Sequence, residues 1–131
     1  MRGKIRPFLM FPGNAEEAVK FYVSLFPDGK VVELVRYGAQ ESGAEGSIRS
    51  ACFSIGGQTI QCFDSPVKHA FSFTPAISLF VDCDSEEEIS RLAAALMDGG
   101  SILMPLGNYG FSRRFAWLSD RFGVSWQLNL E

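Results

Sequence analysis

The sequence predicts an α+β fold built from two β-α-β-β-β repeats. Three observations lead to this prediction. Each half of the chain holds one amphipathic helical segment, strand-like stretches surround it in the same order, and each half closes on a strand that follows a glycine turn. The halves are related by a shift of about 70 residues, which is the signature of an internal repeat.

Length and composition fit one globular domain. The chain has 131 residues, of which 47% are hydrophobic and 21% charged, and a chain of this size buries a core without disulfides or a structural metal. We expect a single domain over residues 1–131, with repeat one at about 4–64, a connector at 65–74 and repeat two at about 75–131.

The first repeat begins with an extended apolar run over Ile5–Phe11. A helix should follow, because Asn14 can cap it and Glu17 stands at the capping-box position. The apolar face of this helix is formed by Ala15, Ala18, Val19, Tyr22, Leu25 and Phe26. Further strands are predicted at 31–37, 50–55 and 58–63, the last two joined by the hairpin signal Gly56-Gly57.

The second repeat follows the same plan. An apolar run over Ala76–Val81 precedes a helix that Asp84 can cap, with Glu87 at the capping-box position. The buried stripe of this helix is formed by Ile89, Leu92, Ala93, Leu96 and Met97. Strands are predicted at 101–104, 111–118 and 124–130.

The closing strands of the two repeats match residue by residue. Residues 57–61 read GQTIQ and residues 123–127 read GVSWQ, so Gln61 and Gln127 occupy equivalent positions. In the last strand Trp126, Leu128 and Leu130 point one way, and Ser125, Gln127 and Asn129 the other, because side chains alternate across a strand. The first set is predicted to be core. On the pattern alone, the polar row is more typical of a solvated surface.

Four stretches of the chain, 7–11, 13–18, 21–22 and 117–128, read PFLMF, GNAEEA, FY and WLSDRFGVSWQL. Together with the repeated element order, they resemble the PhnB-like branch of the vicinal-oxygen-chelate superfamily (glyoxalases, bleomycin-resistance proteins and dioxygenases) over essentially the full length. The resemblance implies a curved mixed sheet, a half-barrel around a cavity, with helices on the outer face. It also moves the row that holds Gln127 from the surface into that cavity.

Metalloenzymes of this superfamily take one ligand from the first strand and one from the last strand of each half. The resemblance places these positions near Pro7 and Ala76 and on Gln61 and Gln127. Proline and alanine offer no ligand atom, and neutral amide oxygens are weak donors for a transition metal. We therefore expect no metal site and no cofactor.

Proteins of the PhnB-like branch often carry the label 3-demethylubiquinone-9 3-methyltransferase. The chain lacks the glycine-rich strand-to-helix turn of dinucleotide and nucleoside binding, and its element order leaves no doubly wound sheet for an adenosyl cofactor. We therefore do not expect methyl transfer.

Aromatic residues supply further candidates for the cavity. They make up 13% of the chain, and pockets are mostly apolar with a few placed polar groups. We name Phe11, Phe63, Phe111 and Trp117 beside the two glutamines, with packing in the core as the alternative for each.

Basic side chains give two weaker candidates. Arg113 and Arg114 are adjacent in a predicted strand and should face opposite ways, so only one can enter the cavity; we name Arg114 as the candidate that would bind a carboxylate or phosphonate. An ion pair with a helix glutamate is the alternative. His69, the single histidine, lies in the connector, where an exposed loop residue is more usual than a general base.

Composition excludes several partners. The net charge is −3 and the basic residues are scattered, which argues against nucleic acid. The apolar stretch near the N-terminus is broken by Pro7, Pro12 and Gly13, too short for a signal peptide or membrane span. Three cysteines lie in apolar runs without metal or disulfide spacing, so we expect buried thiols and a cytoplasmic protein.

Three functions remain open. The first is a protein that binds a small polar or aromatic metabolite in a cavity without the usual metal ligands. The second is an enzyme of the superfamily, an isomerase, lyase or group-transfer catalyst of unknown substrate, because one fold hosts many chemistries. The third is a purely structural or regulatory dimer whose cavity is filled by side chains. The resemblance also implies a homodimer in which half-barrels complete one another across a two-fold axis.

Overall fold

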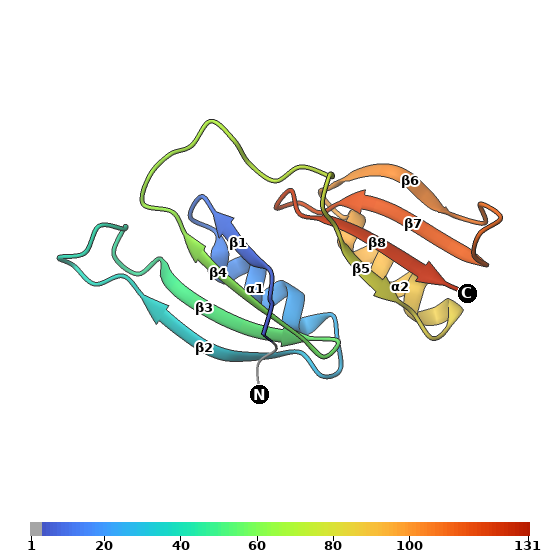
Figure 1. The fold of residues 1–131 in the computed structure, drawn as a ribbon, viewed down its shortest axis with the longest axis horizontal. Helices are drawn as coiled ribbons and strands as arrows, with labels where there is room; N and C mark the ends of the chain where they lie inside the picture. The colour runs from blue at the N-terminus through green and yellow to red at the C-terminus, as the bar shows by residue number, and fades with distance from the viewer. Residues whose placement is uncertain (1–3) are drawn as a thin grey trace. The chain divides into compact units, whose positions relative to one another are not determined.

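The computed structural model describes residues 4–131, which form eight strands and two helices in two compact units, Met1–Ala70 and Phe71–Glu131. Each unit has the order β-α-β-β-β and contains one four-stranded mixed sheet and one helix (Figure 1). The predicted α+β class and the two repeats are confirmed. The boundary between the units falls inside the predicted connector.

Unit 1 pairs its strands in the order β1-β4-β3-β2. Its elements are β1 (Phe8–Phe11), α1 (Ala15–Ser24), β2 (Lys30–Arg36), β3 (Ile48–Ile55) and β4 (Gln58–Asp64). β1 runs parallel to β4, and the remaining pairs are antiparallel. The β3–β4 hairpin turns at Gly56 and Gly57, both with positive φ (53° and 81°), a conformation that glycine adopts without a steric penalty.

Unit 2 repeats this topology with the order β5-β8-β7-β6. Its elements are β5 (Leu79–Asp82), α2 (Glu86–Met97), β6 (Ser101–Gly107), β7 (Arg114–Ser119) and β8 (Ser125–Leu130). β5 is parallel to β8, and β8-β7-β6 is antiparallel.

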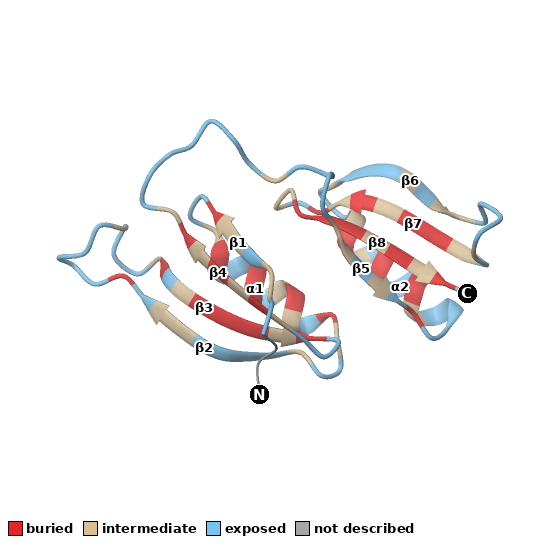
Figure 2. Cartoon of the chain, viewed as in Figure 1, coloured by how far each residue is buried: buried red, intermediate tan, exposed pale blue. Residues whose placement is uncertain are grey.

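One face of each sheet packs on the helix of its own unit and forms the core. In unit 1 the ring of Tyr22 on α1 lies 6.0 Å from that of Phe53 on β3, and both side chains are fully buried. In unit 2 the prediction for Trp126 is confirmed, since it is fully buried on the same face as Leu128. Figure 2 shows buried residues along β3, β4, β7 and β8, while the edge strands β2 and β6 are largely exposed. We call the opposite face of each sheet, which its own helix does not cover, the open face.

The helix caps differ from the predicted ones. Asn14 is the N-cap of α1, but its side chain makes no capping hydrogen bond within residues 4–131. Asp64, at the end of β4, accepts a hydrogen bond from the N–H of Ala15 instead (2.9 Å). In unit 2 the N-cap is Ser85 rather than Asp84; its hydroxyl accepts from the N–H of Glu88 (3.1 Å).

The third strand of unit 2 is shorter than predicted. β7 begins at Arg114, so Phe111 and Arg113 lie in the loop that precedes it. Gly110 has a φ of 93°, which interrupts the extended conformation just before Phe111. The apolar and β-prone residues from Phe111 onward predicted a strand that starts at that residue, whereas β7 starts three residues later.

Candidate functional site

The open face of unit 2 carries a hydrogen-bonded group of four side chains, which we call the polar group: Ser78, Trp117, Ser125 and Gln127. The Ser125 hydroxyl accepts from the Trp117 indole N–H (3.0 Å) and bonds to the Ser78 hydroxyl (2.7 Å). The Gln127 amide donates to the same Ser78 hydroxyl (3.2 Å). Ser125 is buried, and the other three are half-buried.

Strand register brings this polar group together from three elements. Gln127 on β8 stands opposite Trp117 on β7 and opposite Phe80 on β5, so all three side chains project from the same face. Ser78 precedes β5 by one residue and therefore lies two positions before Phe80, on the same face.

Aromatic rings surround the polar group. Phe115 is buried, and its ring lies 6.5 Å from that of Phe80, 5.0 Å from that of Phe111 and 6.3 Å from that of Tyr109. Phe80 is 56% exposed and Phe111 64% exposed, fractions that are large for phenylalanine. The polar group is thus a compact set of donors and acceptors beside an apolar part of the open face of unit 2.

The open face of unit 1 has a different polar pair. The Arg6 guanidinium Nε donates to the Gln61 amide oxygen (2.9 Å), and both side chains are half-buried. Gln61 stands opposite Phe8, whose ring lies 5.3 Å from that of Phe63. Gln61, Gln127, Phe63 and Trp117, four of the predicted cavity residues, therefore lie on the open faces of their units.

Register identifies the first-strand residues that face the glutamines. The residues opposite Gln61 and Gln127 are Phe8 and Phe80, one residue after Pro7 and four after Ala76. Two positions earlier, Arg6 and Ser78 are the side chains that bond to the glutamines. Neither Arg6 nor Ser78 was predicted from the sequence. Strand alternation could have identified them, since Arg6 and Ser78 stand two residues before Phe8 and Phe80 and therefore share a face with them.

Two predicted cavity residues lie on the helix side of their sheets. Phe11 stands opposite Asp64 on β4 and is 1% exposed in the core of unit 1. Arg114 bonds through Nη1 to Glu86 on α2 (3.0 Å), which is the ion pair with a helix glutamate that the sequence left open. Neither side chain shares a face with a glutamine.

The remaining reactive groups are a histidine, three thiols and the Asp82 carboxylate, which accepts from the Asn129 amide on the open face of unit 2 (3.2 Å). His69 is exposed in the connector, with its ring 3.1 Å from the Ser65 hydroxyl. All three cysteines are buried, as predicted, and Cys52 stands opposite Gln61 on the open face of unit 1. Burial raises the pKa of Cys62 to about 12 and that of Cys83 to about 11, so these two thiols are poor nucleophiles at neutral pH.

The open faces do not fit the metal that the superfamily resemblance implies. In unit 1 the Gln61 oxygen already accepts from a guanidinium, and a fixed positive charge at this point repels a divalent cation. In unit 2 the corresponding atoms are an amide and hydroxyl groups, which are weak ligands for transition metals. Within residues 4–131, no group of three or more His, Cys, Asp or Glu side chains is arranged to hold a metal ion.

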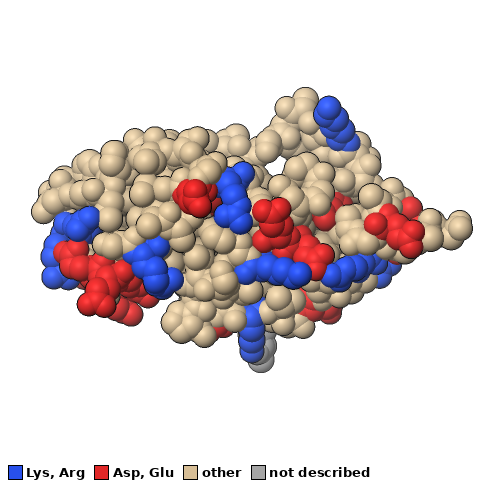
Figure 3. Space-filling view, turned by 180° about the vertical axis from the view of Figure 1, so that it is seen from behind, with Lys and Arg blue, Asp and Glu red and all other residues tan. Residues whose placement is uncertain are grey.

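Charge on the surface is mixed. Figure 3 shows Lys and Arg interspersed with Asp and Glu on the face that it draws, without the continuous basic stripe that a phosphate backbone requires. Neither helix in the described part of the chain is long and apolar enough to span a membrane.

Known proteins resemble the chain over nearly its whole length. It is similar to a solved PhnB protein from Bacillus cereus, with 51% identity, a TM-score of 0.96 and coverage of 98% of this chain and 100% of that one. It is also similar to protein PA1353 from Pseudomonas aeruginosa, with 30% identity, a TM-score of 0.86 and coverage of 100% and 98%. The fosfomycin resistance protein FosX from Listeria monocytogenes shares the fold, at 14% identity with a TM-score of 0.68 and coverage of 98% and 93%. No curated protein matches the chain.

A family model gives the assignment. The model described as 3-demethylubiquinone-9 3-methyltransferase matches residues 3–129, and the repeated β-α-β-β-β units agree with the superfamily resemblance of the sequence. The chain therefore belongs to the 3-demethylubiquinone-9 3-methyltransferase (PhnB) family.

Proposed function

We propose that this protein binds a small, partly aromatic metabolite on the open faces of its sheets, without a metal ion. The observation that carries the proposal is the polar group of Ser78, Trp117, Ser125 and Gln127, set among exposed rings in unit 2. Pockets for small molecules combine mostly apolar walls with a few placed hydrogen-bonding groups.

The chemistry of the polar group suits a ligand oxygen or nitrogen. The bond to Ser78 uses an amide hydrogen of Gln127, so the amide oxygen remains an acceptor for a ligand N–H or O–H. The Trp117 indole N–H donates a hydrogen bond to the Ser125 hydroxyl, and this bond holds the indole ring in place on the sheet. Phe80 and Phe111 then offer ring faces for stacking against a planar ligand.

We propose further that Gln61 and Gln127 each contribute to ligand binding on the open face of its own unit. Support comes from the repeat, because each glutamine follows a glycine turn at the same offset and stands opposite an exposed phenylalanine. Gln61→Ala should weaken binding on the open face of unit 1, and Gln127→Ala binding on that of unit 2. Unchanged binding in either variant would contradict the role of that glutamine.

Methyl transfer is not part of the proposal, although the family model carries that name. The turn from β1 to α1 holds one glycine, Gly13, and the turn from β5 to α2 holds none. A glycine-rich turn that approaches a nucleotide is therefore missing at both strand-to-helix junctions of the described chain.

Native mass spectrometry of protein purified without added ligand tests the proposal. A retained organic molecule, released on denaturation, is the expected result. Gln127→Ala should lower the retained fraction, whereas Gln58→Ala, a matched change at an exposed hairpin glutamine, should not. Equal retention by both variants and the parent protein would contradict the placement of the site.

We propose a homodimer, because the exposed side chains of Val32 on the edge strand β2 and Ile102 on the edge strand β6 give each sheet an apolar edge that a second copy would cover. Sedimentation velocity at micromolar concentration should give a dimer, and a stable monomer would contradict this. We also propose a cytoplasmic protein, in keeping with three unpaired cysteines.

A further inference from the structure

We infer that Arg6, held by Gln61 on the open face of unit 1, binds an oxyanion of the ligand, a carboxylate or phosphonate group attached to an apolar body. The inference rests on the proposed small-molecule function and adds the charge of the ligand to it. It concerns unit 1 alone and uses Arg6, a residue that the sequence analysis did not single out.

The orientation of the pair leaves donors in excess. Arginine has donors only, so the Gln61 amide oxygen must face it, and the bond at 2.9 Å uses only Nε of the guanidinium. Nη1 and Nη2 of Arg6 and the amide nitrogen of Gln61 have no acceptor among residues 4–131 and remain as donors. The backbone N–H of Gln61 donates to the Pro7 carbonyl (3.0 Å), which fixes the two strands that carry the pair.

Arg6 also differs from three other arginines of the protein in its charge balance. Arg36, Arg49 and Arg114 each form an ion pair with a glutamate. In the described part of the chain, no Asp or Glu forms such a pair with Arg6. By register, Glu33 on β2 lies on the same open face, but three strands from β1, or about 14 Å at about 4.8 Å per strand. A half-buried guanidinium without a carboxylate partner is a favourable site for an external anion.

Apolar surface lies directly beside these donors. Phe8, two residues after Arg6, is 63% exposed, and its ring lies 5.3 Å from that of Phe63, two residues after Gln61. A ligand whose anionic group bonds to Arg6 would place its apolar body on these rings. Aryl carboxylates and aryl phosphonates combine the two features.

The corresponding positions in unit 2 are neutral. Ser78 stands where unit 1 has Arg6, and Gln127 donates to its hydroxyl instead of accepting from a cation. Recognition of an anion should therefore depend on unit 1 and be insensitive to Ser78. This asymmetry separates the inference from the general proposal that the open faces bind ligands.

The test uses three probes of matched shape: phenylphosphonate, benzoate and the neutral benzamide. Titrations of the full chain followed by ¹H–¹⁵N correlation spectra report on the Arg6 Nε–H and Gln61 side-chain signals as well as on affinity. Phenylphosphonate and benzoate should shift both signals, and Arg6→Gln should weaken their binding about tenfold or more, as loss of a charged hydrogen bond does. Benzamide should bind the Arg6→Gln variant and the parent protein alike.

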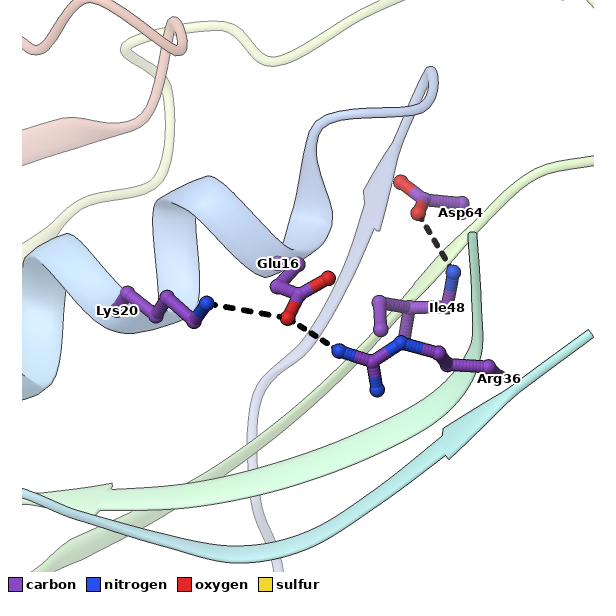
Figure 4. A network of polar contacts seen from close by, with 5 residues as sticks. All are labelled: Glu16, Lys20, Arg36, Ile48 and Asp64. Carbon is purple, nitrogen blue, oxygen red and sulfur yellow. Dashed lines mark hydrogen bonds and ion pairs between the residues drawn. The ribbon is translucent and has the colours of Figure 1, made fainter. Parts of the chain in front are cut away.

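A control variant removes the same charge elsewhere in unit 1. Arg36→Gln changes an arginine on the helix side, where Figure 4 shows its contact with Glu16, and should leave binding of both anions unchanged. Equal binding of benzamide and benzoate to the parent protein, or unchanged anion binding by Arg6→Gln, would overturn the inference while the proposed function stands. Failure of every probe to bind would also overturn it, and retention of a ligand in the native mass spectrum would still decide the proposed function separately.

Discussion

The two units share a topology but differ at one corner, the junction between the start of the helix and the start of the third strand. In unit 1 the buried carboxylate of Asp64 accepts from the N–H of Ala15 at the start of α1 (2.9 Å) and from the N–H of Ile48 at the start of β3 (2.8 Å), as Figure 4 shows for Ile48. In unit 2 the first residue of β7, Arg114, forms an ion pair with Glu86 in the first turn of α2. One corner is a buried link between side chain and backbone, and the other is a surface ion pair.

The hairpins that precede the last strands differ in a similar way. The β3–β4 turn of unit 1 is held from outside by Asp28, whose carboxylate accepts from the N–H groups of Gly56 and Gly57 (both 2.9 Å). These hydrogen bonds lower the pKa of Asp28, and the bond from Gly56 has the largest effect. In unit 2, Asp120 lies within its own turn and accepts from the N–H of Val124 and the indole N–H of Trp126. A repeated topology thus fixes where polar support is needed, but not which residue supplies it.

Truncation of Trp126 should give the largest effect in this comparison. Trp126→Ala removes a fully buried ring and leaves the buried Asp120 carboxylate without its indole partner. We expect a loss of about 3–5 kcal/mol in the free energy of unfolding, measured by urea denaturation. Trp126→Phe separates the two causes, since it keeps most of the ring but removes the donor. Unchanged stability with lost ligand retention would instead assign Trp126 to the site.

Asp64→Ala should be the next largest. It leaves the N–H groups of Ala15 and Ile48 without their acceptor in the core, at about 1–3 kcal/mol for each unpaired buried group. Hydrogen exchange at these two amides should accelerate. Asp64→Asn keeps one acceptor oxygen and should cost less, so an equal loss in both variants would mean that the carboxylate acts through its charge and not through the two bonds.

The helix caps give a smaller contrast between the units. Ser85→Ala should cost about 1 kcal/mol, because the hydroxyl satisfies the N–H of Glu88. Asn14→Ala should change stability by only a few tenths, since the Asn14 side chain makes no capping bond in the described structure and its amide oxygen is buried without a partner there. Thermal unfolding of the two variants in parallel measures the difference. An equal loss in both would show that Asn14 caps α1 in solution.

These contrasts also show which parts of the structure local sequence can predict. Period and turn residues identified both helices and the eight strands, because each depends on side chains close together in the chain. The cap of α1 was missed because Asp64 reaches Ala15 from 49 residues away, a contact that only strand pairing creates. Arg6 and Ser78 were missed for the same reason, since the register of β1 and β5 against the last strands decides which residues meet the glutamines. Arg114 was predicted to enter the cavity but lies on the helix side. Alternation shows that neighbouring residues point to opposite faces, but it does not show which face the helix covers.

The ion pair of Arg114 and Glu86 should give the smallest effect, and its size decides whether the two corners are equivalent. The Arg114 side chain is 33% exposed and the Glu86 side chain 51%, so solvent screens their attraction. Burial of the Arg114 Nε atom without a partner among the described residues offsets part of what the pair contributes. A double-mutant cycle with Arg114→Gln and Glu86→Gln should give a coupling of about 0.2–1 kcal/mol at low salt, and less in 1 M salt, where the screening length is about 3 Å. A coupling above about 2 kcal/mol that salt does not weaken would instead make this pair as strong a link as Asp64, and the difference between the units would then lie only in the residues used.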